Sequence, residues 1–249
     1  MTLKSNFAFS LFLLPILFFA AAEGTRAETV TFKAADGLSV TANLEKASSA
    51  TAIVLFHQAG SSRGEYATIA PRLNNLGYTT LAVDQRSGGT FAGVVNETAK
   101  AAAKAGKPDD YADARPDMEA AISYARALPG IKRVVIWGSS YSAALVLLIA
   151  GEKSVKVDGA LSFSPGEYLR GTSVRGAAAA IAVPTFLSSA RSETAQWQPF
   201  LKAIPKTANA VGFVPEGAGV HGSSALIAGR SPNAAEYWAA VEPFLKAYF

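Results

Sequence analysis

The 249-residue sequence predicts an α/β protein with a doubly wound, mostly parallel sheet and an N-terminal antiparallel hairpin. Short apolar runs rich in β-branched residues recur along the chain, and such runs are typical of strands buried on both faces. Segments with helical spacing separate these runs, which favours parallel strands joined by helices. Two runs that alternate polar and apolar residues come before the first of them and predict the hairpin.

The predicted elements follow in chain order. The hairpin covers residues 28–34 and 38–46, and Asp36-Gly37 supplies its turn. The predicted strands after it are 51–56, 78–83, 133–137, 158–163, 183–189 and 208–214. The predicted helices are 65–76, 113–128, 143–150, 194–204 and 233–248, with Gly77 and Gly151 ending the first and the third.

Two stretches have no regular pattern. Residues 90–111 form a polar, alanine-rich excursion with room for one short helix, too short for a separate lid domain. Because this excursion lies between the end of a strand and the next regular helix, we expect it near the mouth of a substrate site. Residues 176–180 are small and featureless.

The first residues predict a secretory signal peptide. Lys4 precedes an almost unbroken Phe/Leu run over 7–19, and alanines follow at 20–22. The run is short for a membrane span, which needs about 20 residues. We therefore predict a signal peptide at 1–22, cleaved near 22 or 27, and one domain at 28–249. The expected location is secreted or periplasmic, without stable membrane insertion after cleavage; an uncleaved N-terminal anchor is the alternative.

Composition excludes several classes of function. The chain has no cysteine, which rules out disulfides, thiolate catalysis and cysteine zinc sites. It has only two histidines, His57 and His221, so a histidine-rich metal site is excluded. The net charge of +4 is mild and its basic residues are scattered, which argues against nucleic acid as a partner. We expect neither a metal nor a cofactor, and the sequence leaves the oligomeric state open.

The stretch 133–145 joins a buried strand to a helix through a glycine and two serines. The pentad 138–142, Gly-Ser-Ser-Tyr-Ser, resembles the Gly-x-Ser-x-Gly nucleophile elbow of α/β-hydrolases. This resemblance makes Ser140 the nucleophile, and Ser142 takes the place of the last glycine. A serine that only caps the following helix is the alternative interpretation.

Polar residues follow the predicted strands where each one ends. They are the loop 57–60, Asp84, Ser140, Glu193 and His221. Because the carboxyl ends of parallel strands share one edge of a sheet, these residues can converge. The order serine, acid, histidine also resembles that of α/β-hydrolases, nearest to compact esterases and dienelactone-hydrolase-like members with little or no lid. Dienelactone hydrolases proper use cysteine, whereas this chain has serine.

The resemblance assigns a role to each of these residues. His221, between the last strand and the last helix, is the expected base, and Glu193 is the expected acid. Glu167, after the preceding strand, is the alternative acid, and a solvated Glu193 that only begins a helix is the competing interpretation. Asp84 is expected to be a structural turn residue rather than a catalytic one.

The loop His-Gln-Ala-Gly at 57–60 resembles the His-Gly loop that donates one backbone N–H to an oxyanion. The donor is Gln58 or Ala59, and we favour Ala59. The second donor is expected to be the N–H of Tyr141, directly after the nucleophile. His57 is expected to brace the loop.

The resulting functional hypothesis is a serine hydrolase that acts on small or medium acyl esters through an acyl-enzyme. Its partner is therefore a small-molecule ester or other acyl substrate. An amide or peptide hydrolase shares the same chemistry and stays open. A second alternative, from another class, is an exported binding protein that keeps the fold but has lost catalysis. Three departures from the family pattern motivate it: Gln58, Ser142 and Glu193.

Overall fold

A computed structural model of the chain describes Met1, Thr2 and residues 27–249. The predicted signal peptide and both of its cleavage sites concern residues that lie almost entirely outside this described part. Among the helices of the described residues, none is long and apolar enough to cross a membrane.

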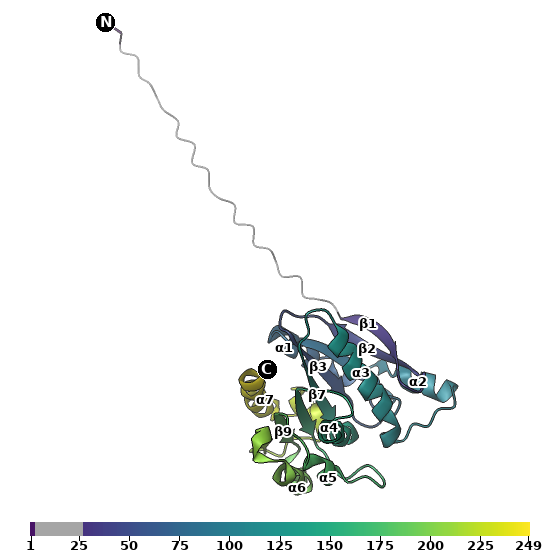
Figure 1. Cartoon of the computed structure of the whole chain (residues 1–249). Coiled ribbons are helices and arrows are strands. Elements are labelled where there is room, and N and C mark those ends of the chain that lie inside the picture. The colour runs from purple at the N-terminus through teal and green to yellow at the C-terminus, as the bar shows by residue number, and fades with distance from the viewer. Residues whose placement is uncertain (3–26) are drawn as a thin grey trace.

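One eight-stranded sheet forms the centre of the domain, in the order β1-β2-β4-β3-β7-β8-β9-β10 (Figure 1). Strand β2 pairs antiparallel with both β1 and β4, and all pairs from β4 to β10 are parallel. The predicted fold class is therefore confirmed. The strands are β1 (Glu28–Lys33), β2 (Ser39–Glu45), β3 (Thr51–Phe56), β4 (Thr79–Val83), β7 (Arg133–Ser139), β8 (Gly159–Phe163), β9 (Thr185–Ser188) and β10 (Ala210–Phe213).

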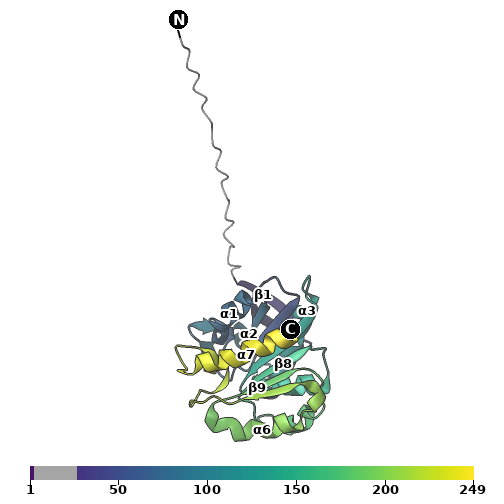
Figure 2. The ribbon, with the colours of Figure 1, turned by 90° about the vertical axis from the view of Figure 1, so that its left-hand side faces the viewer.

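Helices cover both faces of the sheet. On one face, α3, α4, α5 and α6 share a hydrophobic core, and on the other α1 and α7 enclose a second one. Figure 2 shows α7 lying across the sheet in front of β8 and β9. The helices are α1 (Ile69–Asn75), α2 (Glu97–Lys104), α3 (Arg115–Ala127), α4 (Tyr141–Glu152), α5 (Val174–Ala178), α6 (Thr194–Ala203) and α7 (Ala234–Tyr248).

The central strands are the continuous apolar runs that the sequence indicated. Every residue of β3, β4 and β8 is buried, as expected of apolar runs covered by helices on both sides. The hairpin of β1 and β2 turns at Gly37, whose φ of 82° is the left-handed conformation that glycine adopts without strain. The parallel strands from β4 to β10 have their carboxyl ends, and the loops that follow, along one edge of the sheet.

The helix predicted at 65–76 begins later than expected. A 3-10 turn, Arg63–Tyr66, comes first, and the α-helix starts at Ile69. The turn is bound to the end of β3, because the Tyr66 hydroxyl donates to the carbonyl of Phe56 at 2.6 Å. Gly77 ends the helix as predicted, with a φ of 98°.

The prediction that Gly151 stops the elbow helix is wrong, because α4 runs on to Glu152 and ends at Lys153 in the left-handed conformation. Gly151 serves packing instead: a Cβ there would lie 2.0 Å from the carbonyl oxygen of Ala177. Ala177 belongs to α5, a short helix where the sequence had no pattern. The two helices therefore pack closely, which only the folded chain reveals.

The excursion at 90–111 contains a small hairpin, β5 (Thr90–Phe91) with β6 (Val94–Val95), and the helix α2. Asn96 fixes it to the sheet edge, since its side chain caps α2 through Ala99 N and donates to the carbonyl of Gln85 at 2.8 Å. The short helix that the sequence allowed is therefore present.

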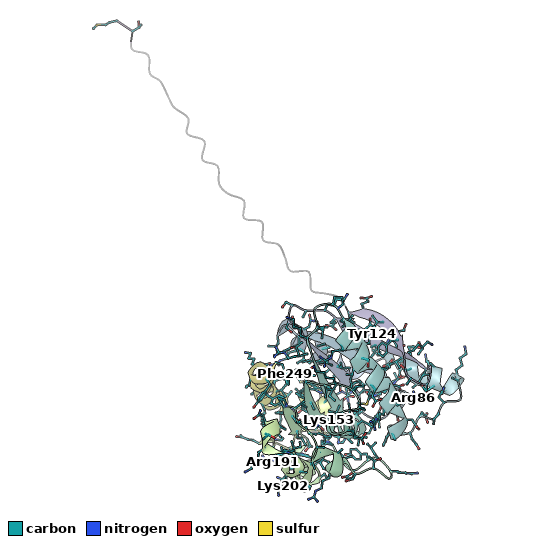
Figure 3. All side chains as sticks on the ribbon, in the orientation of Figure 1. Arg86, Tyr124, Lys153, Arg191, Lys202 and Phe249 are labelled. Carbon is teal, nitrogen blue, oxygen red and sulfur yellow. The ribbon has the colours of Figure 1, made fainter. Side chains whose placement is uncertain are left out.

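Two ionic groups hold the loop after β4. Arg86, labelled in Figure 3, is buried and bonds both carboxylate oxygens of Asp117 on α3, at 2.7 and 3.0 Å. Asp84 is also buried; it accepts the backbone N–H of Arg63 at 2.7 Å and that of Glu97 at 2.9 Å, and it forms an ion pair with the Arg63 side chain. Asp84 is thus a structural residue of this turn, as expected.

Candidate active site

Ser140 occupies the sharp turn between β7 and α4. Its φ of 59° and ψ of −121° are strained for a residue with a side chain, at a cost of about 1–3 kcal/mol. The turn is held by its own N–H, which donates to the carbonyl of Phe163 on β8 at 2.8 Å. Gly138 is needed here, because a Cβ would lie 2.4 Å from the carbonyl oxygen of Ser142. The turn thus has the geometry of a nucleophile elbow.

Ser142, which replaces the last glycine of the elbow motif, has a structural use. Its hydroxyl donates to the carbonyl of His57 at 2.6 Å and accepts from the side-chain amide of Gln85 at 2.6 Å. The residue is fully buried, so these bonds satisfy its hydroxyl. The departure from glycine therefore ties the elbow to the loop after β3.

His221 and Glu193 are in direct contact. His221 Nδ1 lies 2.6 Å from Glu193 Oε1, with the two side chains 40% and 21% exposed. Glu193 ends a 3-10 turn that begins at Arg191, which Figure 3 labels between β9 and α6. Because Nδ1 donates to the carboxylate, Nε2 is the nitrogen left to accept a proton.

A third residue, Ser164, completes this arrangement and was missed by the sequence reasoning. Its hydroxyl donates to Glu193 Oε2 at 2.6 Å and accepts the N–H of Gly222 at 2.8 Å. Its φ of 57° is unusual for serine. The one available signal was its position directly after β8, at the same sheet edge. Ser164 therefore fixes both the acid and the loop that carries His221.

The loop of His221 is also bound to the elbow. The N–H of Ser223 donates to Ser139 Oγ at 2.9 Å, one residue before Ser140. On the other side of the elbow, Ser140 is bonded to Phe163, the neighbour of Ser164. Residues next to His221 are thus tied to residues next to Ser140, which brings the two predicted residues to one site.

The contact between His221 and Glu193 changes the pKa of both. Burial alone would raise the pKa of Glu193, but the hydrogen bonds from His221 and Ser164 outweigh it and the pKa is lowered. The hydrogen bond to Glu193 raises the pKa of His221, against the opposing effect of burial. The arrangement therefore favours a carboxylate beside an imidazolium.

Glu167, the alternative acid, has other partners. Its two carboxylate oxygens accept the N–H groups of Val174 and Arg175, at 2.8 and 3.0 Å. These are the first residues of α5, so Glu167 stabilises the start of that helix. Its position does not support the role of acid, whereas the position of Glu193 does.

The loop after β3 is braced by His57, as expected. His57 is fully buried; Nδ1 lies 2.8 Å from the carbonyl of Gln58, and Nε2 accepts the N–H of Gln85 at 3.0 Å. This pattern requires a neutral ring, and burial lowers the pKa of His57 in the same sense. The N–H of Gln58 donates to Glu65 Oε2 at 2.8 Å, so Ala59 is the better candidate for an oxyanion donor.

Tyr141 is buried at the first turn of α4, where backbone N–H groups have no partner within the helix. Its ring stacks on Tyr111, with centroids 4.6 Å apart, and its hydroxyl donates to the carbonyl of Ser87 at 3.2 Å. The end of the 90–111 excursion therefore lies against the elbow helix.

A pocket of about 340 Å³ opens beside these residues. Tyr111 and Tyr168 both line it, and the Tyr168 hydroxyl donates to the carbonyl of Ser164 at 3.3 Å. Two lining residues of the pocket thus contact neighbours of the predicted site: Tyr111 stacks on Tyr141, and Tyr168 bonds Ser164. Ser87, Asp109, Asp110, Ala112, Leu169 and Arg170 complete its lining.

No group of three or more His, Asp or Glu side chains in the described residues is arranged to hold a metal ion. Ser140, His221 and Glu193 are the residue types that nucleophilic catalysis by serine uses.

Comparison with known proteins identifies the family. Residues 47–200 match the Hydrolase_4 family, described as serine aminopeptidase, S33, and this match covers more than half of the chain. The protein belongs to this family of α/β-hydrolases. The matched range includes the elbow and Glu193 and ends before His221. A search of curated proteins finds no match.

Solved structures agree on the fold of this α/β-hydrolase. The esterase Pf2001 of Pyrococcus furiosus is 19% identical with a TM-score of 0.72, over 90% of this chain and 93% of that one. The dienelactone hydrolase of Anabaena variabilis is 16% identical with a TM-score of 0.68, over 91% and 99%. Est1E of Butyrivibrio proteoclasticus, solved with ferulic acid, is 14% identical with a TM-score of 0.65, over 88% and 98%. At these identities the likeness concerns the fold.

Glu193 and Glu167 can be distinguished by substitution. We expect Glu193→Ala to lower kcat/KM for a short-chain aryl ester by about 10³–10⁴-fold, because the imidazole then loses the group that fixes its tautomer. The matched variant Glu167→Ala should change kcat/KM by less than about 3-fold, since it removes only a helix-end contact. Steady-state kinetics of the folded variants measure both. A larger loss in Glu167→Ala would reassign the acid.

The pH dependence follows from the shifted pKa of His221. A protonated His221 cannot accept a proton, so activity falls as pH decreases through its pKa. Because Glu193 raises that pKa above the ordinary 6.5, the acid limb of kcat/KM should lie above pH 6.5. Glu193→Gln removes the carboxylate charge, so the acid limb should move to lower pH. The kcat/KM that remains in this variant should be small. An acid limb that stays in place would contradict the coupling of the two groups.

Proposed function

We propose that this α/β-hydrolase is a serine hydrolase that cleaves acyl esters of small or medium size. The observation that carries the proposal is the 2.6 Å contact of His221 Nδ1 with Glu193, in a loop bonded to the strained elbow of Ser140. This arrangement leaves Nε2 of His221 free to act as the base. A serine hydroxyl alone is a poor nucleophile at neutral pH, so such a base is the necessary partner.

In the proposed mechanism, Ser140 Oγ attacks the acyl carbon while His221 Nε2 takes the hydroxyl proton. The carbonyl oxygen becomes an oxyanion, for which the N–H groups of Ala59 and Tyr141 are the proposed donors. The ester C–O bond then breaks, and the leaving alkoxide receives the proton from His221. Water, deprotonated by His221, attacks the acyl-enzyme and releases the acid, which restores the Ser140 hydroxyl.

The pocket lined by Tyr111 and Tyr168 supports a compact substrate. Its volume of about 340 Å³ is at the lower end of the range for small-molecule sites. Tyr111 and Tyr168 offer flat apolar surfaces for an acyl or alkoxy group, and the 90–111 excursion supplies the first of them. The printed names of two similar structures, an esterase and a dienelactone hydrolase, are in line with ester cleavage.

Cleavage of an aminoacyl amide or a peptide is the second candidate, because the matched family is described as a serine aminopeptidase. The same three residues would serve, with the amine as the leaving group. A panel of short acyl aryl esters and aminoacyl anilides, assayed with one enzyme preparation, separates the two candidates. Higher kcat/KM on the anilides would replace the ester proposal.

Labelling by a fluorophosphonate probe tests the proposed nucleophile. Wild type should be labelled, and Ser140→Ala should not. The control is Ser123→Ala, whose exposed hydroxyl bonds only its own helix α3, and it should label as wild type does. A wild type that labels no better than Ser140→Ala, with no turnover of any ester or amide, would favour the inactive binding protein instead.

We further propose that the protein is exported, on the basis of the apolar run and small residues of its N-terminal sequence. N-terminal sequencing of the protein recovered from the periplasm or medium of a bacterial host tests this. A start after residue 22 or 27 would support export. Recovery of the full chain in the membrane fraction would favour the uncleaved anchor.

A further inference from the structure

A second carboxylate, Glu65, lies beneath the proposed active site. It belongs to the 3-10 turn Arg63–Tyr66 that follows the loop after β3, and it is fully buried. Burial raises its pKa, against the hydrogen bonds that it accepts. A buried acid is costly unless partners compensate it, so its contacts indicate what it does.

Glu65 accepts one hydrogen bond on each oxygen. Oε1 accepts the hydroxyl of Ser139 at 2.7 Å, and Oε2 accepts the N–H of Gln58 at 2.8 Å. The Ser139 hydroxyl in turn accepts the N–H of Ser223 at 2.9 Å. Both oxygens of Glu65 therefore act as acceptors in these contacts, which is the pattern of an ionised carboxylate.

These contacts join three loops from three different strand ends. Gln58 directly precedes Ala59, the favoured oxyanion donor, and Ser139 directly precedes the nucleophile. Ser223 is two residues after His221. Each of these functional groups therefore lies within two residues of a residue that Glu65 holds, directly or through Ser139.

The approach of the histidine loop to this group is close. Gly222 has a φ of 68°, and a Cβ built on it would lie 2.4 Å from Ser139 Oγ. Only glycine lets the backbone come near enough for the next N–H to reach Ser139. The position of His221 thus depends on Ser139, which Glu65 orients.

The charge of Glu65 also acts on His221, because it raises the pKa of that imidazole together with Glu193. The other titratable groups that Glu65 influences are Tyr66 in its own turn and Tyr141 at the start of α4, and both are buried phenols that stay neutral at physiological pH. In the described residues, His221 is therefore the group on which the charge of Glu65 can have a functional effect.

We propose that Glu65 is a positioning residue that holds the oxyanion loop, the elbow and the histidine loop together. The part that concerns catalysis rests on the proposed function, because it takes His221 as the base. The hydrogen-bonded arrangement of the three loops, and the effect of the Glu65 charge on His221, do not rest on it.

An NMR titration of the imidazole tests the coupling of Glu65 to the histidine loop without any turnover. The sequence has only two histidines, and His57 is buried and neutral, so the titrating signal of the full chain is that of His221. We expect Glu65→Gln to lower the pKa of His221 by about half a unit or more, as loss of a nearby opposite charge does. Glu193→Gln is the positive control, and His221→Asn identifies the signal.

The matched negative control is Glu45→Gln. Glu45 is a partly buried carboxylate at the end of β2, paired with the start of β4 and thus at the opposite edge of the sheet. Its loss should leave the pKa of His221 unchanged. An unchanged pKa of His221 in folded Glu65→Gln would overturn the proposal. A shifted pKa in a protein that labels with no probe and cleaves no substrate would instead count against the proposed function alone.

A double-mutant cycle tests positioning. We expect Glu65→Gln and Ser139→Ala each to lower kcat/KM by about 10–100-fold, and the double variant to lose no more than the worse single one, since both act through one contact. In the double variant of Ser139→Ala with Glu45→Gln, the change in kcat/KM should equal the product of the two single changes. Multiplied losses in the Glu65/Ser139 pair would overturn the shared role. Because Ser139→Ala keeps the charge, its loss of activity also tests positioning when Glu65→Gln is too unstable to assay.

Discussion

Ser140→Ala should lower kcat/KM for a short-chain aryl ester by about 10⁴–10⁶-fold, because it removes the atom that forms the acyl-enzyme in the proposed mechanism. A small residual rate should remain, since the proposed oxyanion donors Ala59 and Tyr141 do not depend on the hydroxyl. The measurement requires highly purified variant protein, because the activity of a trace of wild-type enzyme would exceed that residual rate.

The fold should tolerate this change. The N–H of residue 140 still reaches the carbonyl of Phe163, and alanine carries the same Cβ at the same positive φ. We therefore expect the thermal midpoint of Ser140→Ala to stay near that of wild type. The matched control Ser123→Ala should keep full activity. A folded Ser140→Ala that retains more than about 10% of the activity would mean that another hydroxyl is the nucleophile.

His221→Ala should cause a loss of similar size, about 10⁴–10⁶-fold in kcat/KM. Without an imidazole no group takes the proton of Ser140, and no group returns it to the leaving alkoxide. Fluorophosphonate labelling of Ser140 should slow by a comparable factor, which shows that the loss precedes deacylation. Rapid labelling of His221→Ala would contradict the assignment of the base.

A second variant separates the base from the anchor. His221→Asn keeps a side-chain amide that can donate to Glu193, but it has no nitrogen that accepts a proton. We expect it to be as inactive as His221→Ala and at least as stable in thermal unfolding. The histidine loop itself should stay in place in both variants, because Ser164 holds Gly222 and Ser139 holds Ser223.

Most of the fold could be predicted from the sequence. Continuous apolar runs set the buried strands, since a strand covered by helices on both faces has no polar side to display. The alternation of these strands with helices implied parallel order, and parallel order implied that the strand ends meet. That reasoning predicted that Ser140, Glu193 and His221 lie at one sheet edge, although 81 positions separate the first from the last, and the resemblance to α/β-hydrolases gave the role predicted for each.

The boundaries were less accurate where packing overrides a local signal. Gly151 looks like a helix end, but it lies inside α4 because the backbone of Ala177 approaches it closely. The short α5 follows residues without any period, and its first N–H groups are satisfied by Glu167 from another loop. In both cases the deciding contact comes from a part of the chain that a local pattern does not contain.

The sequence by itself determined the strand ends and the few residue types there that could do chemistry. Only the tertiary structure decided how those residues are joined. Glu193 rather than Glu167 contacts His221, and the backbone N–H of Gln58, the residue before Ala59, donates to Glu65. Ser164 bonds Glu193, and Glu65 bonds Ser139 beside Ser140. The physical reason is that these are hydrogen bonds between loops, with Ser139 and Glu65 74 positions apart. Periodicity reports which face of a strand or helix is buried, whereas a contact between loops depends on how the whole sheet brings its ends together.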